Sequence, residues 1–177
     1  VTGTYALAKL GVPLTMQQAG AWGVILTGNL SQGYTDEELT EFFRGAVIVN
    51  GDAVAELERR GMGQYLGVHC IGSAGIGLYE QCRLDDPINA KLARMPIRDV
   101  RPAFFGGEGE YFKATDPRVR VISDIRDHGG DTLGIGTALY ENELGGRVCV
   151  MGYAPFKMPN DILRFAQLAE ICAWLVL

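Results

Sequence analysis

Apolar and polar positions follow one another in two similar blocks over the first third of the chain. An apolar run at residues 22–27 has the length of a buried strand, and residues 46–49 form a second such run. Each run is followed by residues that favour a helix. Thr35 and Glu38 form a capping box before the first helix, and Gly61 closes the second. Two strand–turn–helix units in succession predict neighbouring parallel strands joined by helices.

Short segments of alternating apolar and polar residues follow in the second half. They predict strands at residues 118–124, 132–140 and 147–153. The dipeptide Gly145-Gly146 predicts a hairpin turn between the last two of these strands. We therefore expect an antiparallel β section over about residues 64–155.

A C-terminal helix is expected to begin near Asn160, because asparagine is a common helix cap. Apolar residues then recur at the i, i+3, i+4 and i+7 spacing of one helix face. Together the patterns predict an α/β fold with a doubly wound parallel sheet, an antiparallel section and a returning helix. The predicted buried face of that helix consists of Ile162, Phe165, Ala166, Ala169 and either Cys172 or Ala173.

The composition suits one globular domain and excludes some classes of partner. The chain has 177 residues, of which 47% are hydrophobic and 21% charged. A net charge of −5 leaves no basic footprint for nucleic acid or an anionic membrane. No apolar stretch reaches the roughly 20 residues that span a bilayer. The start at Val1 and the apolar end at Leu177 are what we expect of a fragment of a longer protein.

The four cysteines are expected to be reduced. None forms a Cys-x-x-Cys pair, and the chain is long enough to fold around a core without a disulfide framework. Reduced thiols favour a reducing, cytoplasmic compartment.

The patterns that mark nucleophilic and metal-dependent catalysis do not occur in recognisable form. Residues 72–75 depart from the Gly-x-Ser-x-Gly elbow because the serine directly follows the first glycine. His69 and Cys70 are neighbours, so in a strand their side chains point to opposite faces. His128 lies in a turn-like run without an identifiable partner. No set of side chains has the spacing of a metal site, and we predict no catalytic residue, metal or cofactor.

Polar side chains at strand ends are the candidates for ligand binding. Parallel sheets bind ligands at the carboxyl ends of their strands. Asn29 follows the first predicted strand, and Asn50 and Asp52 follow the second. Glu80 joins this candidate set as one of several carboxylates that could belong to an acid pair of the kind that hydrolyses glycosides. Nothing in the sequence selects its partner among Glu108, Glu110, Glu141 and Glu143.

Several blocks of the sequence resemble a known family. Residues 24–28, 35–39 and 46–67 are similar to the glutamine amidotransferase-like domain that follows the catalytic barrel in some bacterial glycoside hydrolase-like proteins. Residues 140–153 and the final helix resemble later parts of the same domain. The resemblance implies a single domain over 1–177 with a flavodoxin-like fold, which has a parallel sheet and helices on both faces.

The resemblance also implies an accessory role. In the β-galactosidase relatives this domain contributes to oligomer contacts and borders the sugar site. The expected partners are the catalytic barrel of the same parent chain and a second copy of the protein, with carbohydrate close by. True glutamine amidotransferases carry a cysteine on a strand–helix elbow, and here no helix signal follows Cys70. The sequence therefore favours a non-catalytic accessory domain of a glycoside hydrolase.

Two alternatives remain open. The first is an amidotransferase-type hydrolase that uses Cys70, which requires a helix directly after Cys70 and a histidine within hydrogen-bond reach. The second is a small-molecule-binding domain, which a closed pocket at Asn29 and Asp52 would favour. An exposed apolar surface on the first or last helix would instead favour the accessory domain, because such a surface needs a partner.

Overall fold

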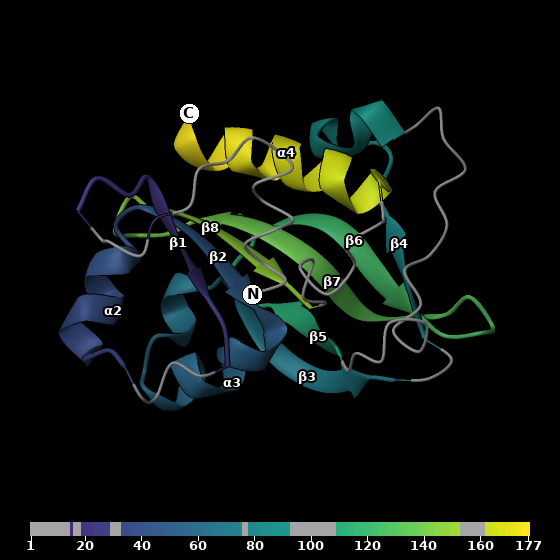
Figure 1. Ribbon diagram of the computed structural model, residues 1–177. Helices are drawn as coiled ribbons and strands as arrows, with labels where there is room; N and C mark the ends of the chain where they lie inside the picture. The colour runs from purple at the N-terminus through teal and green to yellow at the C-terminus, as the bar shows by residue number, and fades with distance from the viewer. Residues whose placement is uncertain (1–14, 16–18, 29–32, 76–77, 93–108, 153–161) are drawn as a thin grey trace.

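One mixed sheet of eight strands organises the described part of the chain (Figure 1). The structure is a computed structural model that describes residues 15, 19–28, 33–75, 78–92, 109–152 and 162–177. Its strands are β1 (Gly23–Leu26), β2 (Ala46–Asn50), β3 (Val68–Ala74), β4 (Tyr79–Cys82), β5 (Gly109–Ala114), β6 (Arg120–Arg126), β7 (Thr132–Glu141) and β8 (Arg147–Met151). Its helices are α2 (Asp36–Phe42), α3 (Gly51–Arg59) and α4 (Ile162–Val176), with 3₁₀ turns η2 (Gly63–Tyr65) and η3 (Pro87–Leu92).

Three strands form the parallel part of the sheet. β1 pairs in parallel with β2, with Gly23 opposite Ala46, and β2 pairs in parallel with β8, with Ala46 opposite Arg147. The prediction that residues 22–27 and 46–50 are neighbouring parallel strands is confirmed. All five residues of β2 are buried, which explains why its first four residues, 46–49, are all apolar.

Helix α2 begins with the predicted capping box. The Glu38 N–H donates to Thr35 Oγ1 at 3.2 Å, and the Thr35 N–H donates to Glu38 Oε2 at 2.8 Å. Both amides would otherwise lack a partner at the helix start. Leu39 and Phe42 are then buried on the inner face of the helix. The local sequence therefore fixes both where α2 starts and which side it buries.

The antiparallel part of the sheet centres on β7. Residues 137–141 of β7 pair with β8, Ile135 pairs with Phe112 of β5, and the opposite edge of β7 pairs with β6. β3 pairs with β5 and β4 pairs with β6, both antiparallel. The predicted hairpin between β7 and β8 is present, and Gly145 adopts the positive φ of +84° that favours glycine.

Two apolar cores lie on opposite faces of the sheet. In β2, Val47 and Val49 belong to the core that α2 and α3 cover. Ile48 points the other way, into the core that α4 covers together with Cys149 and Leu168. Figure 1 shows α4 on one side of the sheet and α2 and α3 on the other.

The buried face of α4 differs from the prediction. Leu168, Ile171 and Leu175 are buried, whereas Ala169 and Ala173 are exposed. The helix is apolar on most sides, so several sets with helical spacing compete, and the larger side chains gain more from burial. Of the other predicted positions, Ala166 and Cys172 are half-buried, and Asn160 and the side chains of Ile162 and Phe165 lie outside the described residues.

The α/β class is confirmed, but the flavodoxin-like parallel sheet is not found. Parallel pairing stops at β8, which is parallel to β2 and antiparallel to β7. β8 also lies within residues 64–155, which were expected to be antiparallel throughout. The physical reason is a long-range pairing: β8 returns beside β2, and no local pattern records which earlier strand a later one will join.

Candidate functional site

Two of the three predicted strand-end residues, Asn50 and Asp52, lie at the start of α3. Asn29 falls outside the described residues. Asn50 is the N-cap of α3 and is only 4% exposed, yet it makes no capping bond, and its Oδ1 has no hydrogen-bond partner in the described structure. Asp52 is exposed, and its carboxyl group lies against Gly28, where a Cβ would come within 3.1 Å of it. The ends of β1 and β2 are therefore adjacent, as predicted for parallel neighbours.

Glu110 reaches the same place from β5, and sequence reasoning did not select it. Its Oε2 packs so closely on Gly51 that a Cβ on that glycine would collide with it. The Glu110 N–H donates to the Gly152 carbonyl at 3.0 Å. A carboxylate is stabilised at a helix start, where the partial charge is positive. The chain's own carboxylate thus disfavours a phosphate at the start of α3, and Gly51 was the sequence signal for this close approach.

Glu80 lies in the interior and links three strands. It is 2% exposed and accepts hydrogen bonds from the hydroxyl groups of Ser123 and Thr137, the latter at 2.7 Å. Such bonds offset part of the free-energy cost of burying a carboxyl group. The contacts give Glu80 a structural role between β4, β6 and β7, and the ligand-binding role of Asn50, Asp52 and Glu80 stays a prediction.

Cys70 lies in the middle of β3, away from any strand–helix elbow. The nearest histidine in sequence, His69, places Nδ1 2.9 Å from Glu58 Oε1, and the Cys70 N–H donates to that same oxygen at 3.1 Å. Burial raises the pKa of the Cys70 thiol, which reduces the thiolate available at neutral pH. In the described residues, the element after β3 is the strand β4. The features that the Cys70 hydrolase requires are therefore not found around this residue.

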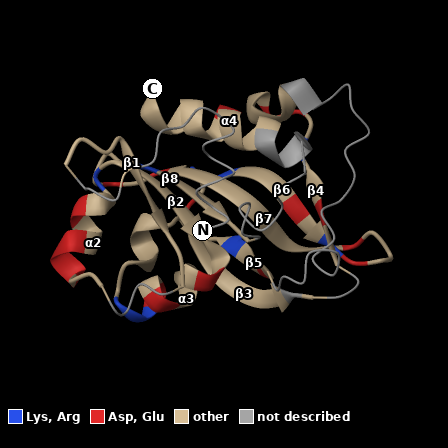
Figure 2. Cartoon of the chain, in the orientation of Figure 1, with Lys and Arg blue, Asp and Glu red and all other residues tan. Residues whose placement is uncertain are grey.

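The charged surface is mainly acidic along two helices. Figure 2 shows acidic residues in red along α2 and in parts of α3, and the first turn of α2 alone carries Asp36, Glu37 and Glu38. Within the described ranges, no group of three or more His, Cys, Asp or Glu side chains could hold a metal ion. The described helices also include none long and apolar enough to cross a membrane.

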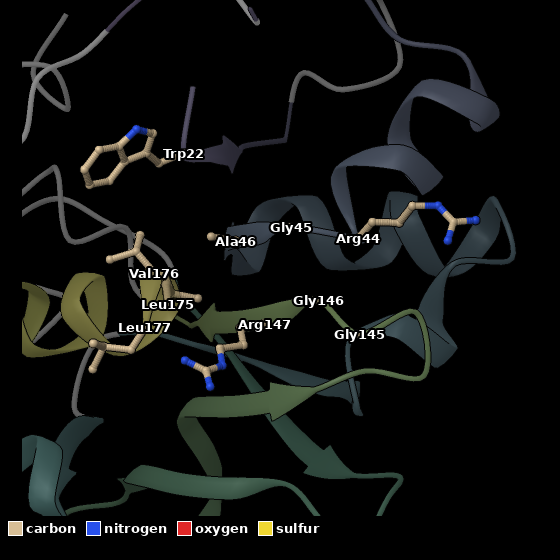
Figure 3. A pocket seen from close by; sticks show the side chains of 10 residues that line it. All are labelled: Trp22, Arg44, Gly45, Ala46, Gly145, Gly146, Arg147, Leu175, Val176 and Leu177. Carbon is tan, nitrogen blue, oxygen red and sulfur yellow. The ribbon is translucent and has the colours of Figure 1, made fainter. Parts of the chain in front are cut away.

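A shallow groove of about 660 Å³ lies at the amino ends of the parallel strands (Figure 3). Trp22 stands on one side of it, and the end of α4, with Val176 and Leu177, stands on the other. Trp22 is 82% exposed, Val176 51% and Leu177 93%. Six large hydrophobic side chains are exposed in the described part of the chain, and these are three of them. Exposed apolar surface is thus concentrated at this groove.

The floor of the groove offers few free polar groups. The Gly45 N–H donates to the Phe42 carbonyl, and the Gly45 carbonyl accepts from the Arg147 N–H. The Arg147 side chain bonds Glu141 at 3.1 Å and the Trp174 carbonyl at 2.7 Å. Figure 3 shows the Arg44 side chain pointing away from the groove. These paired groups leave a surface suited to an apolar partner.

Comparison with known proteins finds a match in fold. Neither a family model nor a curated protein matches the sequence. Among solved structures, the chain is similar to alpha-L-fucosidase isoenzyme 2 from Paenibacillus thiaminolyticus, with a TM-score of 0.69 and 15% sequence identity. The match covers 99% of this chain and 29% of the fucosidase chain. The fold is therefore one that occurs within a glycoside hydrolase chain, and the comparison gives no support to a glutamine amidotransferase-like domain.

Proposed function

We propose that the chain is a non-catalytic accessory domain of a glycoside hydrolase, where it supports assembly or borders the sugar site. The observation that carries this proposal is the fold match, which uses nearly all of this chain but 29% of the alpha-L-fucosidase chain. A fold that forms a minor part of a larger enzyme chain is a natural candidate for a supporting module.

The groove at Trp22 supports the same proposal. Val176 and Leu177 belong to the last helix and the residue after it, where an exposed apolar surface favours a module with a missing partner. We assign this surface to the catalytic barrel of the same polypeptide. A second copy of the chain would also bury the groove, and a concentration-dependent mass would distinguish that occupant from the barrel.

The hydrolase alternative and the small-molecule-binding alternative both have weaker support. A hydrolase based on Cys70 lacks a histidine contact to its thiol in the described structure, and burial raises the pKa of that thiol. A small-molecule site at Asn50 and Asp52 lacks a described cavity, although the unpaired Asn50 Oδ1 keeps this possibility testable by ligand titration.

The proposal is tested by comparing the 177-residue chain with the protein made from the full coding region. Both are assayed with nitrophenyl α-L-fucoside and β-galactoside. We expect turnover by the full protein and none by the isolated chain. Turnover by the isolated chain that is lost in Cys70→Ser would overturn the proposal, and so would a coding region without a glycosidase domain. Cys149→Ser, at a thiol buried under α4, is the matched control substitution.

A further inference from the structure

Strand β3 has an edge that no other described strand covers. It lies at one end of the sheet path and pairs with β5 alone among the described strands. On its outer face His69 and Ser73 are exposed, and the Ile71 side chain is 45% exposed. An open strand edge carries unpaired amide and carbonyl groups, so it is a template for pairing with another chain. Such an edge needs a feature that blocks pairing.

Glu58 of α3 occupies this edge. Its Oε1 accepts the Cys70 N–H at 3.1 Å and lies 2.9 Å from His69 Nδ1. The Thr115 N–H donates to the Gly67 carbonyl, and bonded and non-bonded pairs alternate along an antiparallel ladder, so Cys70, which lies opposite Phe112, directs its amide away from β5. It is the amide that an added strand would use. The carboxyl group is mostly sheltered, with 22% of the Glu58 side chain exposed.

A shift in the strand register also weakens pairing at the same point of the β3 edge. The register between β3 and β5 shifts between Cys70 and Gly72. A bulge twists a strand and interrupts the straight row of amides that a partner strand needs. The bulge and the Glu58 contact share Cys70, so both act on the middle of the edge.

We propose that Glu58 blocks the β3 edge and so prevents antiparallel pairing of β3 with β3 of a second copy of this chain. Removing its carboxyl group frees the Cys70 amide beside the apolar Ile71 side chain. In the paired form the Ile71 side chains of the two copies bury each other, which lowers the free energy of the pair. A second copy is therefore the favoured occupant of the edge. This inference is independent of the accessory-domain proposal, because it concerns the opposite end of the sheet path from β1 and the groove.

The test is the mass of Glu58→Ala by light scattering over a range of concentrations. We expect its weight-average mass to rise to about double that of the unchanged chain. Glu56→Ala is the matched control, because Glu56 lies on the same helix but bonds Arg59. Glu58→Ala/Ile71→Lys should return to the mass of the unchanged chain. An unchanged mass for a folded Glu58→Ala, an equal rise in Glu56→Ala, or persistent association of the double variant would overturn the proposal.

Amide exchange in the unchanged chain gives a second measurement that does not depend on a variant folding. The Cys70 amide points away from β5, yet its bond to Glu58 should make its exchange slow. Exchange as fast as that of an exposed loop amide would overturn the proposal.

Discussion

Single side chains decide where the elements of this fold begin and how they are tied together. Thr35 sets the start of α2, Asn142 anchors the β7–β8 turn, and Asp116 joins two neighbouring side chains. Of these, only Thr35 was identified from the sequence. Its partner is three residues away, so the pattern is local. The partners of Asn142 and Asp116 include residues that are distant in sequence, and no local pattern contains them.

Thr35→Ala should destabilise the chain by about 1 kcal/mol, because it leaves a helix-start amide without its acceptor. Thr35→Ser keeps the hydroxyl group and should preserve most of the stability. Urea melts of the two variants and the unchanged chain provide the measurement. Equal midpoints for all three would mean that the cap does not stabilise α2.

Asp116 should make stability depend on pH. Its carboxylate accepts from Arg118 at 2.7 Å and from the Tyr140 hydroxyl at 3.0 Å, and the Arg118 hydrogen bond holds the pKa of Asp116 well below its usual range. A lowered pKa stabilises the fold above the unfolded value of about 4, and this contribution is lost as pH falls further.

Asp116→Asn should therefore be less stable than the unchanged chain at neutral pH, with the difference shrinking as the pH drops below about 4. The midpoints of urea melts of both proteins, measured from neutral pH to below about pH 4, test this prediction. Asp85→Asn, which removes one exposed carboxyl group, is the control for the loss of a negative charge. A difference that stays constant with pH would contradict the assigned role.

At the scale of elements, local patterns predicted strands and helices better than they predicted pairing. The two front strands and the β7–β8 hairpin formed as expected, because consecutive strands joined by one helix or by a short turn have few ways to pair. The position of β8 beside β2 was not predicted, since residues 46–50 and 147–151 are far apart in sequence. The predicted buried face of α4 was wrong at Ala169, which is exposed, because an almost wholly apolar helix has no clear apolar stripe.

The turn between β7 and β8 also depends on a contact across the fold. Asn142 Nδ2 donates to the Phe43 carbonyl at 2.8 Å, and Asn142 Oδ1 accepts the Leu144 and Gly146 amides, each at 3.0 Å. Asn142 is 5% exposed, so these groups would be left unpaired in the interior if it were removed.

Asn142→Ala should lose about 2–3 kcal/mol of unfolding free energy through those unsatisfied groups. Glu143→Ala, at the exposed next position, should stay within about 0.5 kcal/mol of the unchanged chain. Denaturant melts compare the two variants. A loss no larger in Asn142→Ala than in Glu143→Ala would show that the turn is held by other contacts.

At the scale of the whole molecule, the candidate site was only partly accessible to sequence reasoning. Asn50 and Asp52 were found because they follow a strand that the apolar pattern made obvious. Glu110 was not selected, because it reaches Gly51 from a strand about sixty residues later. The sequence did not predict the groove, because Trp22 and Leu177 lie near opposite ends of the sequence and come together only in the folded chain.

Trp22→Ser should lower the stability of the full protein more than it lowers the stability of the isolated chain. Trp22 is mostly exposed in this structure, so its removal leaves the fold of the chain itself intact, while a docked partner would lose an apolar contact. The expected result is a lower melting temperature in the full protein only. Leu84→Ser is the control, since Leu84 is also exposed but lies outside the groove. Equal effects of the two substitutions would argue against docking at Trp22.

The accessory-domain account is tested most directly by hydrogen exchange at the groove. Backbone amides of residues 22–26 and 174–177 are compared between the 177-residue chain and the protein from the full coding region, with β3 amides as an internal reference. The account, in which a catalytic barrel covers the groove, predicts slower exchange at both groove segments in the full protein and unchanged exchange in β3. Equal exchange of the groove segments in the two proteins would contradict it.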